Sequence, residues 1–264
     1  MKKNTISKEL KIAIKASKKA EKVIMSYYGR QIESKQKHDL TPVTNADIEA
    51  EKTIIETISN NFPKHGFLSE ESGEINLSED YIWIIDPIDG TKNFIRGNPL
   101  FSTQIALIKK GNPVLGVSNM PLMNEMMYAE TGCGSYLNNK QINVSRCSDI
   151  FSSEISLGGL NHFVSNNKIN NVLNIVRQVS RVRGFGDTYA YHLLTTGRCE
   201  AVIEENISIW DIAAISVIIE EAGGRITEFN GNKINYQTKS VIASNKILHE
   251  SYINLFNHNN LKSC

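Results

Sequence analysis

An apolar run that ends abruptly in two acidic residues constrains this chain more than any other feature. Trp83, Ile84 and Ile85 are followed directly by Asp86-Pro87-Ile88-Asp89-Gly90-Thr91. The apolar run predicts a buried strand, and carboxylates at the end of such a strand are typical of a site for a hard cation. Backbone N–H groups freed by a glycine turn can hold phosphate beside the metal. The segment therefore favours phosphate-ester chemistry that depends on a divalent metal.

The same segment offers three oxygen donors within four residues. Pro87 fixes one backbone angle, so that the side chains of Asp86 and Asp89 can converge while the Ile88 carbonyl turns inward. Ligation by oxygen alone favours Mg²⁺ or Mn²⁺ over zinc. An ordinary Asp-Pro turn closed by Asp-Gly would use the same residues, and the buried strand before it is what favours the metal site. Phosphatases with an aspartyl nucleophile have one residue between their two acids, whereas this chain has two, which argues against covalent aspartyl catalysis.

The overall composition limits the classes of partner. The 264 residues suit one large domain or two modest ones, and 29 Lys plus Arg against 28 Asp plus Glu argue against broad binding to nucleic acid or a membrane surface. The four cysteines show no C-x-x-C spacing, and neither a secretory signal nor an apolar stretch of about 20 residues is evident. We therefore expect a soluble cytoplasmic protein with reduced thiols.

Periodicity predicts helices first, then a meander of strands, then alternating units. One helix begins after Ser7 and ends near Gly29, and a second runs over about 45–60 with Ile48, Ile55 and Ile58 on one face. The predicted strands of the meander are Tyr81–Ile85, Phe101–Ile108, Val114–Asn119 and Met126–Ala129. The later segments are predicted as helices over 165–179, 188–197 and 212–222 and strands over 200–203 and 225–229. The pattern predicts an α+β protein whose sheets are layered with helices, either one domain over 1–264 or two subdomains of about 1–150 and 151–264.

Four further acidic residues have ordinary structural explanations of their own. Glu70 and Glu71 follow the short apolar pair Phe67-Leu68, and two adjacent acids are usually a solvated loop. Thr44 and Asp47 match a helix capping box, so Asp47 gains a further role only if it also reaches the metal turn. Asp211 opens a helix, where an acid is a favourable cap.

The ordered set of motifs is more specific than its parts. Glu70-Glu71, Asp86-Pro87-Ile88-Asp89-Gly90-Thr91 and Trp210-Asp211-Ile212-Ala213-Ala214 together resemble the inositol monophosphatase family of Mg²⁺-dependent, lithium-sensitive phosphatases. The match extends to further short segments along nearly the full chain: Val43-Thr44-Asn45-Ala46-Asp47, Gly116-Val117, Gly132-x-Gly134, Glu221-Ala222-Gly223-Gly224 and Ala243-Ser244-Asn245.

The resemblance implies a fold, a set of metal ligands and a mechanism. Members fold as a layered αβαβα sandwich, like the fructose-1,6-bisphosphatases, and commonly form homodimers. The implied ligands of two or three Mg²⁺ ions are Glu70, Asp86, the Ile88 carbonyl, Asp89 and Asp211. Thr91, Asp47 and Glu70 would orient a metal-bound water for in-line attack, without a phosphoenzyme, and a second metal at Asp86, Asp89 and Asp211 would stabilise the leaving oxygen. The N–H groups of Gly90 and Thr91 would hold the phosphate oxygens.

Two segments indicate the substrate. Residues 92–97 and 183–191 resemble the histidinol-phosphatase branch of the family more than the inositol branch. Histidinol phosphate carries an ammonium group, so Asp187 and Glu204 could pair with it, while Arg183 is a candidate for phosphate or imidazole contacts and Asp89 and Asp211 would face the substrate. Asp187 could equally cap the helix that starts near Thr188.

Two alternatives to histidinol-phosphatase activity stay open. One is an inositol-1-monophosphatase or a broad sugar-phosphate phosphatase. The other belongs to a different class, because some bacterial members of the family bind the transcription machinery. The near-neutral charge and the lack of a basic stripe argue against RNA binding by this chain.

Overall fold

The computed structural model describes residues 6–30, 34–36 and 42–258, and the chain forms two compact units. The first unit comprises the residues up to Gln141 together with Trp210–Glu221, and the second comprises Ile142–Ile209 and the residues from Ala222 onward. In these described ranges, every helix is too short or too polar to traverse a lipid bilayer. The chain therefore enters the second unit, returns to the first for one helix, and leaves it again.

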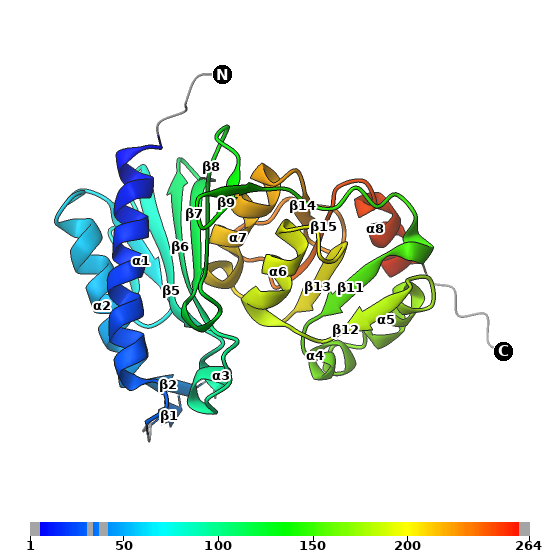
Figure 1. Ribbon diagram of the computed structural model, residues 1–264, viewed down its shortest axis with the longest axis horizontal. Helices are drawn as coiled ribbons and strands as arrows, with labels where there is room; N and C mark the ends of the chain where they lie inside the picture. Colours follow the sequence, from blue (N-terminus) through cyan, green and yellow to red (C-terminus); the bar gives the residue numbers. More distant parts are fainter. Residues whose placement is uncertain (1–5, 31–33, 37–41, 259–264) are drawn as a thin grey trace. The chain divides into compact units, whose positions relative to one another are not determined.

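The first unit is built on an eight-stranded sheet in the order β10-β9-β8-β7-β6-β5-β3-β4 (Figure 1). Its strands are β3 (Gly66–Ser69), β4 (Gly73–Ile75), β5 (Tyr81–Asp89), β6 (Ser102–Lys109), β7 (Asn112–Met120), β8 (Glu125–Glu130), β9 (Ser135–Leu137) and β10 (Lys140–Ile142). The other elements of this unit are α1 (Lys8–Tyr27), β1 (Ser34–Gln36), β2 (Pro42–Thr44), α2 (Asn45–Ser59), α3 (Thr91–Ile95), η1 (Pro121–Met123) and α7 (Ile209–Glu221). Neighbouring strands are antiparallel except for β3 and β5, which run parallel.

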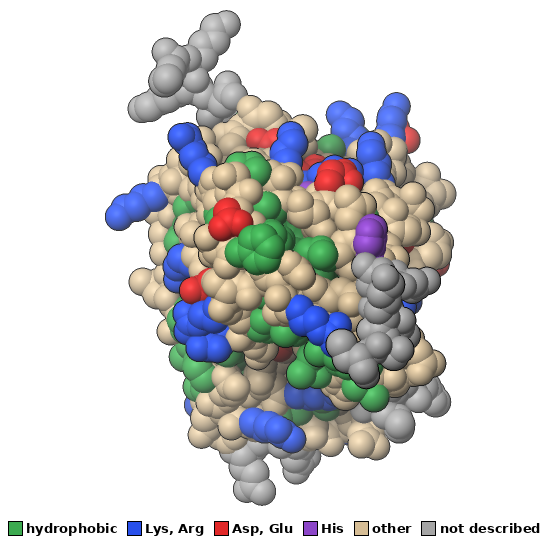
Figure 2. Space-filling view, turned by 90° about the vertical axis from the view of Figure 1, so that its right-hand side faces the viewer, with side chains coloured by type: hydrophobic (Ala, Val, Ile, Leu, Met, Phe, Trp, Pro, Cys, Tyr) green, Lys and Arg blue, Asp and Glu red, His purple; other side chains and the backbone are tan. Residues whose placement is uncertain are grey.

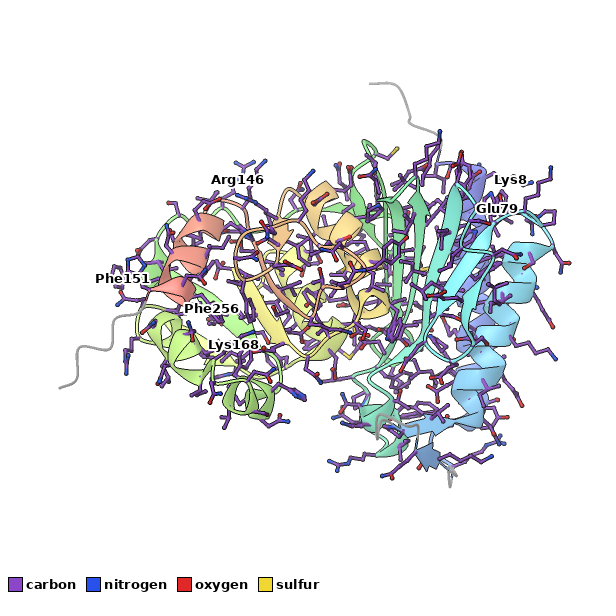
Figure 3. All side chains as sticks on the ribbon, turned by 180° about the vertical axis from the view of Figure 1, so that it is seen from behind. Lys8, Glu79, Arg146, Phe151, Lys168 and Phe256 are labelled. Atoms are coloured by element: carbon purple, nitrogen blue, oxygen red, sulfur yellow. The ribbon has the colours of Figure 1, made fainter. Side chains whose placement is uncertain are left out.

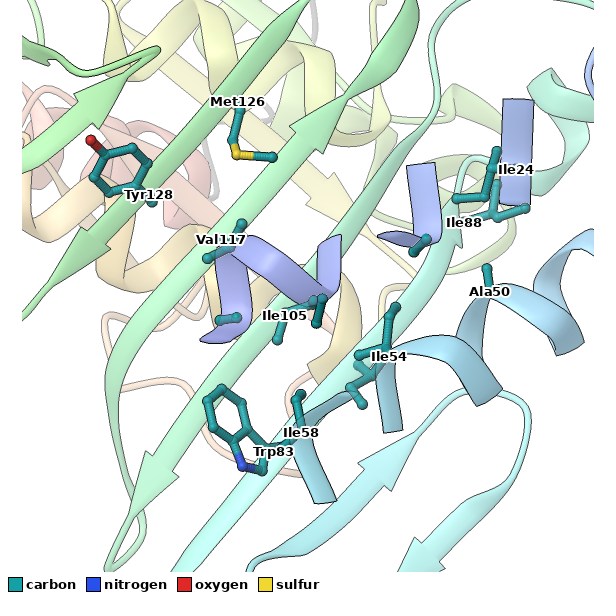
Figure 4. Close-up of a cluster of buried hydrophobic side chains, with 14 of the residues drawn as sticks. Ile24, Ala50, Ile54, Ile58, Trp83, Ile88, Ile105, Val117, Met126 and Tyr128 are labelled. Carbon is teal, nitrogen blue, oxygen red and sulfur yellow. The ribbon is translucent and has the colours of Figure 1, made fainter. Parts of the chain in front are cut away.

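Helices α1 and α2 pack against each other and cover one face of this sheet (Figure 1). Ser7 caps α1 by accepting a hydrogen bond from the Leu10 N–H at 3.0 Å, as the sequence predicted. The core between helices and sheet includes Ile54, Trp83 and Ile105 (Figure 4). Alternate residues of each strand contribute to this core, because side chains along a strand point to opposite faces.

Helix α7 packs on the other face of the same sheet. A Cβ on Gly116 in β7 would lie 2.1 Å from the Ala214 carbonyl oxygen of α7. Across the sheet, Ile84 of β5 pairs with Ala106 of β6, and Ala106 pairs with Gly116 of β7. The side chains in this row therefore become smaller from β5 to β7, where α7 makes its contact. Only glycine allows the backbones of α7 and β7 to approach this closely.

The second unit holds a five-stranded sheet in the order β12-β11-β13-β15-β14. Its elements are η2 (Ile150–Ser152), β11 (Glu154–Leu157), α4 (Leu160–Ser165), α5 (Ile169–Val176), β12 (Arg181–Arg183), α6 (Asp187–Thr195), β13 (Ala201–Glu205), β14 (Arg225–Thr227), β15 (Ser240–Ser244) and α8 (His249–Asn257). Phe163, Val172 and Phe256 bring α4, α5 and α8 into one core with the sheet. Lys168 and Phe256 lie close together in this unit (Figure 3). Phe229 contacts both, with Lys168 Nζ 5.0 Å from the centre of its ring.

The predicted α+β class with layered helices and sheets is confirmed, while several details differ. Of the three residues expected on the apolar face of the second helix, Ile58 is buried and Ile55 is partly buried against the core, but Ile48 is 53% exposed, so its placement was wrong. The buried face also includes Asp47 and Glu51. The helix expected over 165–179 is the shorter α5, and α4, which precedes that range, was not predicted. Asn167, whose φ of 57° is left-handed, lies between the two helices. Strands β11 and β12 were not predicted, because both are short and β12 is charged.

Candidate functional site

Three carboxylates of the first unit converge at the end of β5. Among the described residues, Asp86, Asp89 and Asp211 each offer an oxygen within 4.8 Å of the others. Asp86 and Asp89 are buried, whereas Asp211 is partly exposed. Three such oxygens around one point can hold a hard cation.

A β-bulge explains how two aspartates three residues apart reach the same site. Asp86 pairs with Gln104 and Asp89 with Ser102, so three steps along β5 match two steps along β6. On a regular strand, residues i and i+3 point to opposite faces, and the extra residue of the bulge corrects this. The Pro87 carbonyl accepts a hydrogen bond from the Thr103 hydroxyl at 2.9 Å, and the Ser102 hydroxyl lies 3.4 Å from Asp89 Oδ2. Proline is tolerated here because its missing N–H falls at the irregular point of the ladder.

Asp86 has the least favourable electrostatic environment described for the cluster. Burial raises the pKa of the Asp86 carboxyl well above its usual range, and the neighbouring charges of Glu70, Asp89 and Asp211 raise it further. Asp86 Oδ1 is buried without a hydrogen-bond partner. A buried carboxylate oxygen that is both unpartnered and repelled by like charges is a position that a cation would stabilise.

Glu70 reaches this site from the neighbouring strand. Because β3 and β5 run parallel with Ser69 opposite Ile85, Glu70 emerges beside Asp86, and its N–H donates to the Ile85 carbonyl at 3.1 Å. Glu70 is not a member of the group of three mutually close carboxylates, although its charge is the largest of those acting on Asp86.

Asp47 connects the start of α2 to the turn after β5. It forms the predicted capping box, in which the Thr44 N–H and hydroxyl donate to Asp47 Oδ2 at 2.8 and 2.6 Å. Its other oxygen, Oδ1, lies 3.4 Å from the Thr91 hydroxyl, which also donates to the Ile88 carbonyl at 3.0 Å. The condition for a role beyond capping is therefore met, because Asp47 reaches the turn.

The turn itself depends on Gly90, which adopts a left-handed φ of 84°. A Cβ at this position would lie 2.9 Å from the Leu100 carbonyl oxygen. The short helix α3 begins at the next residue, Thr91, which is buried. Glycine is required here for both its backbone angle and its size.

Asp211 occupies the first turn of α7. The far end of the helix is held by Glu221, whose carboxylate accepts hydrogen bonds from the N–H groups of Gly132 and Gly134 at 2.8 and 2.7 Å. The interior of the helix, residues 212–219, is buried. This packing fixes the position of α7 on the sheet and so the position of Asp211.

The remaining predicted residues lie in the second unit. Arg183 ends β12, and its guanidinium donates to the Val182 carbonyl at 3.0 Å. Glu204 is buried on β13 and accepts a hydrogen bond from the Tyr191 hydroxyl at 2.6 Å. Asp187 is exposed at the start of α6, directly after Gly186 at the N-cap position, and its φ of 46° is left-handed. Strands β11, β12 and β13 are parallel, which brings Arg183 and Glu204 to the same edge of their sheet.

A cavity of about 540 Å³ also lies in the second unit, away from any predicted site residue. Its lining includes Lys168, Glu228, Phe229 and Phe256. Two of these charged side chains already bind other residues of the protein. Lys168 forms an ion pair with Glu205 at 2.6 Å, and Glu228 accepts a hydrogen bond from the Thr238 hydroxyl at 2.8 Å. We therefore place the chemistry at the carboxylate cluster rather than in the cavity.

Sequence reasoning missed the residues that support the site. Glu51 lies four residues after Asp47 on α2, and Ser102 opposes Asp89 on β6. The spacing of two acids on one helix face could have indicated Glu51, because residues i and i+4 lie on the same face. Ser102 has no comparable signal, since its role follows from the register of the bulge.

Known proteins resemble this chain over most of its length. Residues 6–261 match the model of the inositol monophosphatase family. A histidinol-phosphatase of Chlorobaculum parvum is 34% identical over 93% of this chain and 95% of its own length. The Nus factor SuhB of Salmonella typhimurium is 33% identical over 89% of this chain and 91% of its own length. Among solved structures, the IMPase of Thermotoga maritima superposes with a TM-score of 0.86 at 32% identity, over 95% of this chain and 97% of its own.

Proposed function

The chain belongs to the inositol monophosphatase family, and from this premise we propose that it is a Mg²⁺-dependent phosphomonoesterase that hydrolyses L-histidinol phosphate to L-histidinol and phosphate. The observation that carries the phosphatase chemistry is the convergence of Asp86, Asp89 and Asp211. The similarity to a histidinol-phosphatase over 93% of the chain supports the substrate. A cytoplasmic enzyme of histidine biosynthesis, sensitive to lithium and active as a homodimer, is part of the same proposal.

Oxygen ligands for the metal would come from three segments of the first unit. Asp86, the Ile88 carbonyl and Asp89 would hold two or three Mg²⁺ ions together with Glu70 and Asp211, and Mn²⁺ would suit the same donors. The buried, unpartnered Oδ1 of Asp86 and the crowding of like charges fit a bound cation. When bound, the ions would acidify water and neutralise charge on the phosphate ester.

The residues of the turn would orient the attacking water and the phosphate. The Thr91 hydroxyl lies 3.0 Å from the Ile88 carbonyl and 3.4 Å from Asp47 Oδ1. By turning toward Asp47 it could pass its own proton to that carboxylate while Oγ1 accepts a proton from water. Glu70 would hold the same water from the end of the neighbouring strand, β3. The N–H groups of Gly90 and Thr91 would bind the phosphate oxygens, and direct attack by water needs no phosphoenzyme.

Recognition of histidinol would depend on three further polar side chains. Asp187 would pair with the ammonium group, Arg183 would contact phosphate or imidazole, and Glu204 would contribute a second carboxylate. Glu204 supports this role because it is buried and held by Tyr191, which keeps its side chain in one orientation.

A panel of phosphate esters tests the proposal. Histidinol phosphate, inositol 1-phosphate, fructose 1,6-bisphosphate and adenosine 3′,5′-bisphosphate would be compared by kcat/KM with Mg²⁺, with and without lithium. We expect histidinol phosphate to give the highest value. A higher value for inositol 1-phosphate or for the sugar phosphate would instead assign the chain to the alternative phosphatase activities.

A second candidate is a binding factor for the transcription machinery. The 33% identity to a Nus factor supports this candidate. On the face seen in Figure 2, Lys and Arg side chains are spread among polar and apolar ones, which offers no single basic stripe for RNA. Tight binding of RNA polymerase or RNA with negligible phosphate release would favour the factor over the enzyme.

A further inference from the structure

We propose that Glu51, a buried glutamate of α2, is a positioning residue that holds Glu70 in place for metal binding. The inference rests on the proposed function, because it assigns a partner to one of the proposed metal ligands. Glu51 is 1% exposed, and a buried carboxylate is costly unless it is hydrogen-bonded.

Both carboxylate oxygens of Glu51 bind the turn that follows Glu70. Oε2 accepts a hydrogen bond from the Glu71 N–H at 3.0 Å, and Oε1 accepts one from the Ser72 hydroxyl. Hydrogen bonds to an ionised carboxylate are roughly twice as strong as those between neutral groups. The turn is therefore fastened to α2 at two consecutive residues.

The same turn is fastened to the sheet on its other side. The Glu70 N–H donates to the Ile85 carbonyl at 3.1 Å, and Ser69 pairs with Gly73, so only Glu70, Glu71 and Ser72 lie between the paired positions of β3 and β4. With the backbone fixed before and after its side chain, Glu70 is directed to Asp86, on which its charge acts.

Glu51 and Asp47 lie one helical turn apart on the buried face of α2. Asp47 reaches Thr91 in the turn after β5, and Glu51 reaches the turn after β3. Between and beyond them, Ala50 and Ile54 pack into the core, so the helix is a rigid support for both (Figure 4). One helix thereby sets the distance between two segments of the site that are far apart in the sequence.

The test is a double-mutant cycle on metal binding. Mn²⁺ affinity would be measured directly by titration calorimetry for the native protein, Glu51→Ala, Glu70→Gln and the double variant. We expect Glu51→Ala to weaken Mn²⁺ binding by about 10-fold or more, as removal of an outer partner of a metal ligand typically does. In the Glu70→Gln background the same substitution should cost less than about 2-fold, because Glu51 acts through Glu70.

The control is Glu56→Ala, which removes an exposed carboxylate from the same helix and should leave Mn²⁺ affinity unchanged. Equal losses from Glu51→Ala in both backgrounds, or no loss in either, would overturn the proposal. If Glu51→Ala fails to fold, Ser72→Ala removes one of the two hydrogen bonds and takes its place in the cycle, with the same two outcomes. A native protein that binds Mn²⁺ as expected but hydrolyses no ester of the panel would contradict the proposed function and leave this inference standing.

Discussion

At the scale of single residues, the cluster of carboxylates lowers the stability of the protein when no cation neutralises it. Asp86 illustrates the cost, since burial and three neighbouring acids all raise the pKa of its carboxyl. In the absence of metal, the protein would be more stable with an apolar or neutral residue at this position. Functional sites commonly carry such costs because the ligand, when bound, offsets them.

Asp86→Asn is predicted to stabilise the metal-free protein and to lower its activity with Mg²⁺. Removing one charge from a group within 4.8 Å of two others should raise the free energy of unfolding, measured in chelator, by on the order of 2 kcal/mol. With Mg²⁺, kcat/KM should fall at least about 100-fold, more than replacing an outer partner of a ligand typically costs. Asp80→Asn, an exposed control, should change either quantity little. A lower melting temperature for Asp86→Asn in chelator would contradict the account.

Asp187→Asn tests recognition of the substrate cation at constant side-chain size. Loss of a charge-assisted pair should raise KM for histidinol phosphate by roughly 10-fold, because such a pair contributes about 1.5 to 3 kcal/mol. An uncharged sugar phosphate should show less than about a 2-fold change. Asp187→Ser should give the same pattern, and equal effects on both substrates would reject the assigned role.

At the scale of elements, the sequence was most informative where a pattern has one physical meaning. The apolar run before Asp86 predicted a buried strand, and Ser7 and Thr44 predicted two helix starts that the structure confirms. The bulge between Asp86 and Asp89 could not be predicted, because it depends on register against β6. The burial of Asp47 and Glu51 on α2 was missed for a related reason, since these acids are held by contacts with distant turns.

Gly116→Ala probes the contact that seats α7 on the sheet. The added Cβ would lie 2.1 Å from the Ala214 carbonyl oxygen, so helix and sheet must move apart. We expect a loss of about 1 to 3 kcal/mol in the free energy of unfolding, together with weaker Mg²⁺ binding because α7 carries Asp211. Gly184→Ala is the matched control, since its nearest neighbour would be 3.9 Å away. Unchanged thermal stability and unchanged Mg²⁺ binding of Gly116→Ala would show that α7 is seated differently.

At the scale of the whole molecule, the order of segments along the chain does not match the division into units. Helix α7 lies in the first unit, although the strands before and after it, β13 and β14, belong to the second. The alternation of strand and helix in this part of the sequence suggested that they pack together. Instead, the close contact of Gly116 with Ala214 packs α7 against the sheet of the first unit. A contact between residues about 100 positions apart leaves no local signal in the sequence.

The stability of the protein should depend on pH through His249, a residue of the second unit. This buried imidazole lies 2.7 Å from the Ser244 hydroxyl and 3.0 Å from the Thr227 hydroxyl, and it joins α8 to β14 and β15. Burial, followed by the nearby charge of Arg225, lowers the pKa of His249 from 6.5 to about 4. Between these values the unfolded chain binds a proton that the folded protein does not, so stability is complete above pH 6.5 and falls as the pH drops toward 4.

The expected loss across this window is on the order of 3 kcal/mol, with a slope of at most about 1.4 kcal/mol per pH unit from this one group. Urea unfolding of the metal-free protein at a series of pH values would measure it. His249→Gln should remove this part of the slope, even though it lowers stability at every pH, whereas His258→Gln, a change at the exposed C-cap of α8, should retain it. An unchanged slope in His249→Gln would mean that His249 binds its proton equally in both states, and the hydroxyls of Ser244 and Thr227 would then have to accommodate the imidazolium.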